Sequence, residues 1–239
     1  MKVLSIGNSF SVDAHAYLHP LAKTYGVDMK LANLYIGGCE LRRHYLNALD
    51  DKFAYEFCFN GQGTKLLTSI RMALESDEWD VVTLQQASVK SVDFNTYSPY
   101  IEYLCEYVKK YSPKSKIYIH QTWAYENGSA NLQNVLGYDN AQDMYNDLAL
   151  SYKKAFELIS ADGFIPCGSA MINGANAGLK MHRDCHHASL GVGRYLLALT
   201  WLKALTGIDI SNDNFSDLQE PISETERKII IDAVNKACK

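Results

Sequence analysis

Short apolar segments alternate with longer amphipathic segments along most of the chain. The apolar segments, rich in residues that favour β-strands, cover residues 2–6, 29–36, 80–84, 116–121 and 163–166. Between them, apolar residues recur at intervals of three and four, as at Ile101, Leu104, Cys105 and Val108, which indicates helices with one buried face. This alternation predicts an α/β fold, a three-layer α/β/α sandwich in which helices cover both faces of a mostly parallel central sheet.

Four further segments refine this prediction. Residues 53–60 alternate in polarity before two glycines, which predicts a short extra strand or one arm of a hairpin. Residues 122–140 are polar and predict a long loop after the fourth strand, and loops of this length are often functional. Residues 189–201 have the spacing of a buried helix, and residues 222–237 predict a last helix. Because no linker or repeat interrupts the pattern, we expect one domain over residues 1–239.

Composition and charge exclude several classes of partner. The 239 residues are 47% hydrophobic and 21% charged, as in an ordinary globular protein, and the net charge is −4. Lysines and arginines are scattered among acids, so we expect neither nucleic acid nor an anionic membrane as a partner. The apolar stretch after Lys2 is too short for the core of a signal peptide. We expect a cytoplasmic location for the chain as it stands, or a periplasmic or secreted one if a leader has been removed.

The chain has six cysteines and no CxxC pair. A chain of this length can fill a hydrophobic core without disulfide bonds. We therefore expect most of the cysteines to be buried free thiols.

The segment "SIGNSFSVDA", residues 5–14, carries an apolar strand directly into Gly-Asn-Ser. A buried strand that ends in such a turn and continues as a helix can hold a serine exposed at the carboxyl edge of a sheet. This makes Ser9 a candidate nucleophile. The alternative is a helix-capping turn without chemistry, because Asn8, Ser9 and Ser11 are all good N-cap residues.

The segment "MHRDCHHASLGVGRYLLALTW", residues 181–201, contains a second candidate. Asp184 and His187 are three residues apart, so the carboxylate can accept the Nδ1–H of the imidazole and leave Nε2 free to accept a proton. The alternative is that Asp184 caps the following helix and His187 lies at the surface without a role.

Potential metal ligands also crowd this region: His182, Asp184, Cys185, His186 and His187. Their spacing matches neither HExxH nor CxxC, so we expect no metal site. A catalytic cysteine is not indicated either. Cys39, which follows Gly37 and Gly38, is the cysteine nearest to a suitable glycine turn.

The order of these motifs resembles that of the SGNH (GDSL-like) hydrolases, over essentially the whole chain. Residues 7–9, Gly-Asn-Ser, stand in place of the family's Gly-Asp-Ser, Gly38 matches the glycine of the second block, and Asp184 and His187 match the final Asp-x-x-His. The segments "GNSFS", "GGCELRRH", "LQQAS" and "HQTWAY" resemble most closely an uncharacterised, largely bacterial branch of the superfamily. The resemblance implies a flavodoxin-like SGNH hydrolase fold and a serine esterase that needs no cofactor.

The resemblance also implies roles for the site residues. Ser9 would be the nucleophile, His187 the general base and Asp184 the group that orients the imidazole. The backbone N–H groups of Ser9 and Gly38 would form the oxyanion hole.

The third block departs from the family. The family's Gly-x-Asn, whose asparagine donates to the oxyanion, is absent, and residues 84–88 read Leu-Gln-Gln-Ala-Ser. The side-chain amide of Gln85 or of Gln86 offers a similar donor on a longer stem, and the sequence does not choose between them.

The substrate implied is a small-acyl ester, an O-acetyl ester above all, of a carbohydrate. We expect Gln121 and Trp123, with the loop from Tyr125 to Asn140, to line a polar cleft, because an indole face packs against sugar C–H groups. The alternative is that Trp123 fills core space and Gln121 caps a strand end. A different class of function, a catalytically weak or inactive sugar-binding or polar-ligand-binding protein on the same fold, stays open because of the altered third block.

Overall fold

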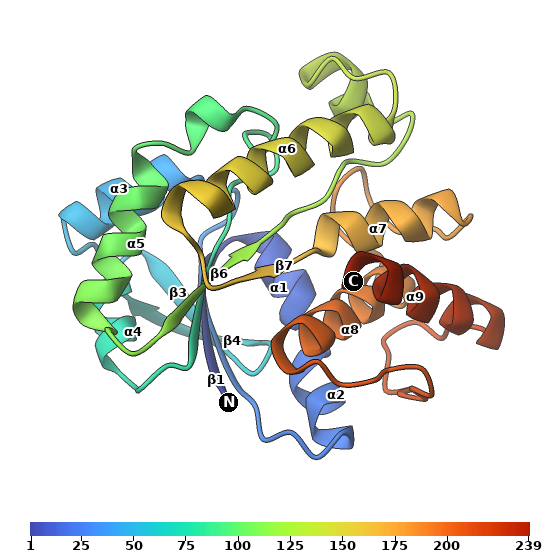
Figure 1. Ribbon diagram of the computed structural model, residues 1–239, viewed down its shortest axis with the longest axis horizontal. Coiled ribbons are helices and arrows are strands. Elements are labelled where there is room, and N and C mark those ends of the chain that lie inside the picture. The colour runs from blue at the N-terminus through green and yellow to red at the C-terminus, as the bar shows by residue number, and fades with distance from the viewer.

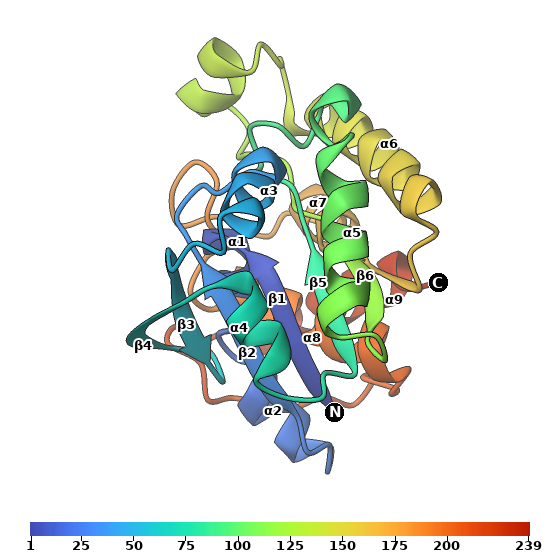
Figure 2. The ribbon, with the colours of Figure 1, turned by 90° about the vertical axis from the view of Figure 1, so that its left-hand side faces the viewer.

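The computed structural model covers residues 1–239 and contains one seven-stranded sheet between two layers of helices (Figure 1). The strands are β1 (Lys2–Gly7), β2 (Lys30–Tyr35), β3 (Tyr55–Phe59), β4 (Gln62–Thr68), β5 (Val81–Leu84), β6 (Lys116–His120) and β7 (Gly163–Ile165). Their spatial order is β4-β3-β2-β1-β5-β6-β7. Strands β2, β1, β5, β6 and β7 are parallel to one another. Strands β3 and β4 form an antiparallel hairpin that extends the sheet beyond β2 (Figure 2).

The predicted α/β sandwich is confirmed. Each of the five predicted parallel strands is present, with ends that differ by one residue at most. Strands covered on both faces bury most of their residues, which explains their continuous apolar sequences. The whole of β5 is buried, and only Lys2 of β1 is partly exposed.

Helices lie on both faces of the sheet. They are α1 (Ser9–His15), α2 (Leu18–Thr24), α3 (Leu41–Leu49), α4 (Ile70–Glu75), α5 (Tyr100–Tyr111), α6 (Ala141–Ile159), α7 (Cys167–Asn176), α8 (Val192–Thr206) and α9 (Glu224–Ala237). Helices α3 to α6 pack together in one layer, and α1, α2 and α7 to α9 pack in the other (Figure 1). A single cluster of 63 buried residues joins the layers. Every helix is too short or too polar to span a lipid bilayer.

Several boundaries differ from the sequence prediction. Residues 53–60 contain β3 as expected, but β4 was not predicted, because an edge strand such as Gln62–Thr68 keeps most of its side chains exposed. Helix α8 begins at Val192 and not at residue 189. Helix α9 begins at Glu224 and not at residue 222, because Ser223 forms its capping box. The long loop contains one π-helical turn, Asn131–Val135.

The strand order places a crevice above β1. The chain moves from β1 to β2 on one side and then crosses back to β5 on the other side. At such a switch point, the loops that follow neighbouring strands diverge and leave room for a ligand at the carboxyl ends of the strands. The segments that begin at Asn8, Ile36 and Gln85 all start at this edge.

Candidate functional site

Ser9 is the first residue of α1 and directly follows the turn at the end of β1. Asn8 is the N-cap residue, and its side chain accepts the N–H of Phe10 at 3.0 Å. The capping interpretation is therefore correct for Asn8, and the same turn exposes Ser9. Gly7 is needed here, because a Cβ at this position would lie 2.3 Å from the Ser11 hydroxyl.

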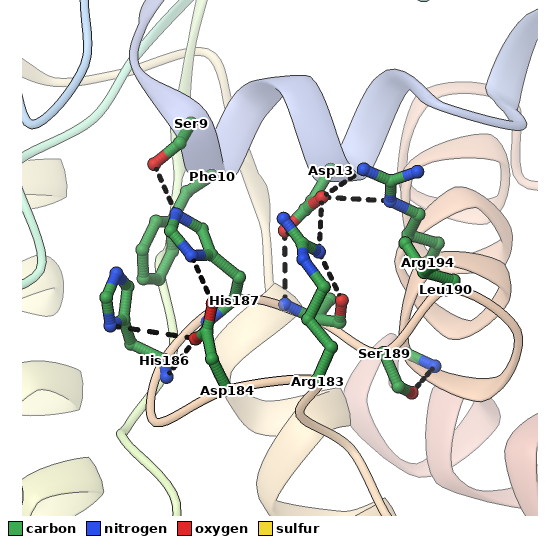
Figure 3. Close-up of polar contacts among 12 residues, drawn as sticks. Ser9, Phe10, Asp13, Arg183, Asp184, His186, His187, Ser189, Leu190 and Arg194 are labelled. Carbon is green, nitrogen blue, oxygen red and sulfur yellow. Dashed lines mark hydrogen bonds and ion pairs between the residues drawn. The ribbon is translucent and has the colours of Figure 1, made fainter.

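The Ser9 hydroxyl faces the Asp184–His187 turn (Figure 3). Ser9 Oγ lies 3.0 Å from His187 Nε2, and His187 Nδ1 lies 2.8 Å from Asp184 Oδ2. The other oxygen of Asp184 accepts the backbone N–H groups of His186 and His187 at 2.9 and 2.7 Å. A donor at Nδ1 leaves the Nε2 lone pair for the serine proton.

The carboxyl of Asp184 stays ionised in this turn. Desolvation acts to raise its pKa, but the two backbone N–H donors and the His187 ring outweigh it and hold the pKa well below its usual range. The turn thus presents a fixed negative charge to His187.

A buried carboxylate behind Ser9 holds this turn in place (Figure 3). Asp13 is fully buried one helical turn after Ser9, and its oxygens accept Arg183 Nη1 at 2.9 and 3.0 Å and Arg194 Nε at 2.9 Å. It also accepts the backbone N–H of Ala188 at 3.1 Å. Arg183 and Ala188 flank the Asp184–His187 turn, so helix α1 carries both Ser9 and the anchor of that turn. Asp13 is not recognisable as a functional residue from the sequence, because its partners lie 170 or more residues away.

A pocket of about 400 Å³ opens over Ser9. Its lining is Asn8, Ser9, Phe10, Tyr35, Gly37, Gly38, Ala87, Ser88, Val89, Tyr125, Asn131, His186 and His187. No acidic, lysine or arginine side chain is among these residues. The ring of His186 packs between those of His187 and Tyr125, with ring centroids 4.0 and 5.2 Å away. Desolvation is the main cause that lowers the pKa of His186, and the nearby His187 lowers it further. The pocket is therefore neutral apart from the imidazoles.

The backbone N–H groups of Ser9 and Gly38 both border this pocket and have no acceptor in the protein. Gly38 has a φ of +62°, in the left-handed region that favours glycine, and nothing lies within 4 Å of a Cβ built there. The glycine is thus required by the backbone conformation and leaves the N–H accessible.

Neither glutamine of the third block lines this pocket, which corrects the expectation for Gln85 and Gln86. Gln85 Nε2 donates to Asn8 Oδ1 at 2.9 Å, and its oxygen lies 2.8 Å from Nδ1 of His120. Gln86 Nε2 donates to Thr96, and its oxygen accepts two backbone N–H groups. Both side chains are buried, and their amides are engaged in interactions within the protein.

The expectation for Gln121 and Trp123 is corrected as well, since neither lines the pocket. Trp123 is fully buried, stacks on Phe10 with ring centroids 4.1 Å apart, and donates from Nε1 to the carbonyl of His186 at 2.8 Å. Gln121 Oε1 accepts the N–H and hydroxyl of Ser169. The core-filling alternative is correct for Trp123, and Gln121 is a buried residue whose oxygen accepts from the first turn of α7. The following loop instead contributes Tyr125 and Asn131 to the lining.

The cysteines are all free, four of them buried and two, Cys185 and Cys238, half-buried. Burial raises the pKa of the Cys39 thiol to about 12, so this residue is a protonated thiol of the core.

Comparison with known proteins identifies the family. The family described as "Domain of unknown function (DUF4886)" matches residues 2–237. The chain belongs to the DUF4886 family. A crystal structure of another DUF4886 protein, from Bacteroides uniformis, shares 34% identity, covers 99% of this chain and 94% of that chain, and has a TM-score of 0.90.

More distant structures share the fold of the DUF4886 chain. A member of the lipolytic protein G-D-S-L family from Veillonella parvula has 11% identity and a TM-score of 0.57, over 87% of this chain and 100% of that chain. An acetyl xylan esterase has 16% identity and a TM-score of 0.53, over 86% and 100%. No curated protein matches the sequence. The fold is therefore that of the SGNH (GDSL-like) hydrolases, as the motif order implied.

Proposed function

We propose that this DUF4886 protein is a serine ester hydrolase in which Ser9, His187 and Asp184 act as a catalytic triad. The observation that carries the proposal is the continuous pair of short contacts, 3.0 Å from Ser9 Oγ to His187 Nε2 and 2.8 Å from His187 Nδ1 to Asp184 Oδ2. Serine hydroxyls are weak nucleophiles until a base removes the proton, and a base oriented by a third group is the arrangement that activates them.

The reaction follows from this geometry. As Ser9 Oγ attacks the ester carbonyl, its proton passes to His187 Nε2, and the imidazolium is stabilised by the Asp184 carboxylate. His187 then gives the proton to the leaving alcohol, which breaks the ester bond and leaves an acyl group on Ser9. Water, deprotonated by the same imidazole, releases the carboxylic acid and restores the serine.

The oxyanion that forms in each step needs donors nearby. The free N–H groups of Ser9 and Gly38 border the pocket and are suited to this role, and removal of one such donor typically lowers the rate by about 10²–10³. With Gln85 and Gln86 engaged elsewhere, the proposed hole relies on these two backbone groups.

We propose small-acyl esters of carbohydrates, O-acetyl esters above all, as the substrate class. The aromatic rings of Tyr35, Tyr125 and Phe10 can pack against a sugar, and the amide of Asn131 can bond its hydroxyls. The lack of charged side chains suits a neutral ester. One of the proteins that shares the fold is an acetyl xylan esterase.

The decisive experiment compares Ser9→Ala with the wild-type protein on an activated acetate ester. We expect the variant to keep its fold and thermal stability, because Ser9 makes its only side-chain hydrogen bond to His187, and to lose hydrolysis. A serine-directed phosphonate should label Ser9 in the wild type. Labelling of a different serine, or full activity of the variant, would refute the proposed nucleophile.

A sugar-binding or polar-ligand-binding protein without activity is the second candidate. The observation in its favour is the engagement of both third-block glutamines, so that neither of them is a donor for the oxyanion. Retention on immobilised acetylated oligosaccharide, combined with no labelling by the phosphonate and no release of acetate, would support the binder over the hydrolase.

A further inference from the structure

Asp184, Cys185 and His186 bring three potential metal ligands together beside the proposed triad. Cys185 Sγ lies 3.0 Å from His186 Nδ1, which lies 3.8 Å from Asp184 Oδ1, and the ligand atoms of the three residues all lie within 4.8 Å of one another. In a tetrahedral zinc centre, with metal–ligand bonds of about 2.0–2.3 Å, ligand atoms are about 3.3–3.7 Å apart. Small side-chain rotations would therefore bring all three atoms to one ion.

The surroundings of the three atoms suit a metal ion. The Asp184 side chain is exposed, and those of Cys185 and His186 are half-buried, so an ion can enter from solvent. Asn131 Nδ2 lies 3.0 Å from Cys185 Sγ and can donate to a thiolate there. The neighbouring Arg183 side chain points toward Asp13, to which it donates, and away from Asp184 and His186 (Figure 3).

We propose that Asp184, Cys185 and His186 form a binding site for a zinc ion, and that bound zinc inhibits the hydrolysis proposed above. Thiolate, imidazole and carboxylate are the three ligand types that zinc takes in proteins. On binding, the Cys185 thiol releases its proton to solvent, the two other ligands contribute lone pairs, and water fills the fourth position.

Inhibition follows from the double use of Asp184. Its Oδ1 accepts the N–H groups that fix the turn, and its Oδ2 holds His187. Coordination pulls the carboxylate toward the ion and cancels the negative charge that would stabilise the His187 imidazolium during catalysis. The zinc is thus an inhibitor bound to the orienting residue and takes no part in the reaction.

The test of binding uses cobalt(II) as a spectroscopic probe on the full chain. We expect the wild type to bind one cobalt ion with a thiolate-to-cobalt charge-transfer band, which zinc removes by competition. Cys185→Ser should lack the band and bind zinc at least about tenfold more weakly, since loss even of an outer-shell partner costs 10–100-fold. Cys238→Ser, the other half-buried cysteine, is the matched control and should behave as the wild type.

The test of inhibition is separate from the test of binding. Zinc should inhibit hydrolysis by the wild type and Cys238→Ser, a chelator should restore the activity, and Cys185→Ser should resist zinc with its basal activity unchanged, since Cys185 does not line the pocket. A wild type without the cobalt band, or the same band in Cys185→Ser, refutes the site. Binding without inhibition of an active enzyme refutes the inhibitory role. Binding by a protein that hydrolyses no ester counts against the proposed function and leaves the site standing.

Discussion

Asp13 holds the Asp184–His187 turn in place, so we predict that the buried substitution Asp13→Asn lowers kcat and leaves KM nearly unchanged. The carboxylate of Asp13 is fully buried and accepts Arg183, Arg194 and the N–H of Ala188. An asparagine keeps the shape but replaces one acceptor by an NH₂ group, which faces the donors of the anchored turn. Breaking a buried ion pair in this way costs about 3–5 kcal/mol of folding free energy, because the remaining charges lose their partner.

The effect on catalysis follows from the position of the anchor. Ala188 directly follows His187, so loss of the Ala188 contact lets the imidazole shift relative to Ser9, and a misplacement of about 1 Å can lower a rate about 10²-fold. The pocket lining does not include Asp13. We therefore expect kcat to fall by about this factor in the folded fraction of Asp13→Asn, with little change in KM.

The assay compares kcat, KM and the urea midpoint with those of Asp213→Asn. Asp213 is also a buried carboxylate, 3.9 Å from Arg227, but its partners lie away from the turn. We expect the Asp213→Asn variant to lose folding stability and to keep the kcat of the wild type. Arg183→Lys keeps the positive charge but loses the paired contacts to Asp13, so it should lower kcat less than Asp13→Asn does. It is the milder variant to measure if Asp13→Asn fails to fold. Equal kcat values for Asp13→Asn and Asp213→Asn, both measured on folded protein, would show that the anchor does not position His187.

Further predictions concern the triad and the pocket. Because the pKa of Asp184 lies well below its usual range, its carboxylate should stay ionised on the acid side of the pH–rate profile, and protonation of Asp184 should make no contribution to the loss of activity there. Asp184→Asn should lower kcat more than KM, and unchanged turnover would remove Asp184 from the site. Exhaustive chelation should leave activity intact or raise it, and its loss, with recovery on adding zinc, would contradict the triad. Acetylated sugars should be better substrates than long-chain acyl esters, and Asn131→Ala should reduce that preference, whereas efficient hydrolysis of long acyl chains alone would refute the substrate class.

The sequence predicted the parts of the molecule that depend on local patterns. Short apolar runs indicate the parallel strands, and the residue types around Ser9, Gly38, Asp184 and His187 indicate the turns in which the structure places these residues. Parallel topology brings Ser9, after β1, and Gly38, after β2, to one edge of the sheet. His187 lies in the loop between α7 and α8, and contacts of Asp13 with Arg183 and Ala188 hold that loop near Ser9, so that residues 178 positions apart lie 3.0 Å from each other.

The direction in which a side chain points at the end of a strand cannot be predicted from local sequence patterns. Trp123 and Gln121 follow β6 at the correct edge, but their side chains turn into the core, where burying an indole on Phe10 gains more than exposing it to solvent. Asp13 has no local signal at all, since a lone acid in a helix indicates burial only when its distant arginines are known. The edge strand β4 is missed because it is defined by its hairpin partner and not by a buried face.

The asparagine at position 8, where the resembled motif has an aspartate, has a physical explanation in the structure. Asn8 accepts Phe10 N–H and Gln85 Nε2 at its oxygen, and donates from Nδ2 to the carbonyl of Cys39, the residue after Gly38, at 3.1 Å. An aspartate at position 8 would set a carboxylate oxygen against that carbonyl, with no proton to share. Gln85 in turn is held by His120, whose pKa burial lowers to about 3, so this ring is neutral. The chain from His120 through Gln85 to Asn8 therefore ties the ends of β6, β5 and β1 to the segment that carries Gly38. The asparagine is therefore explained by its donor contact to the Cys39 carbonyl, whereas Gln85 donates to an oxygen that an aspartate would also offer and supports the Gly38 segment through Asn8.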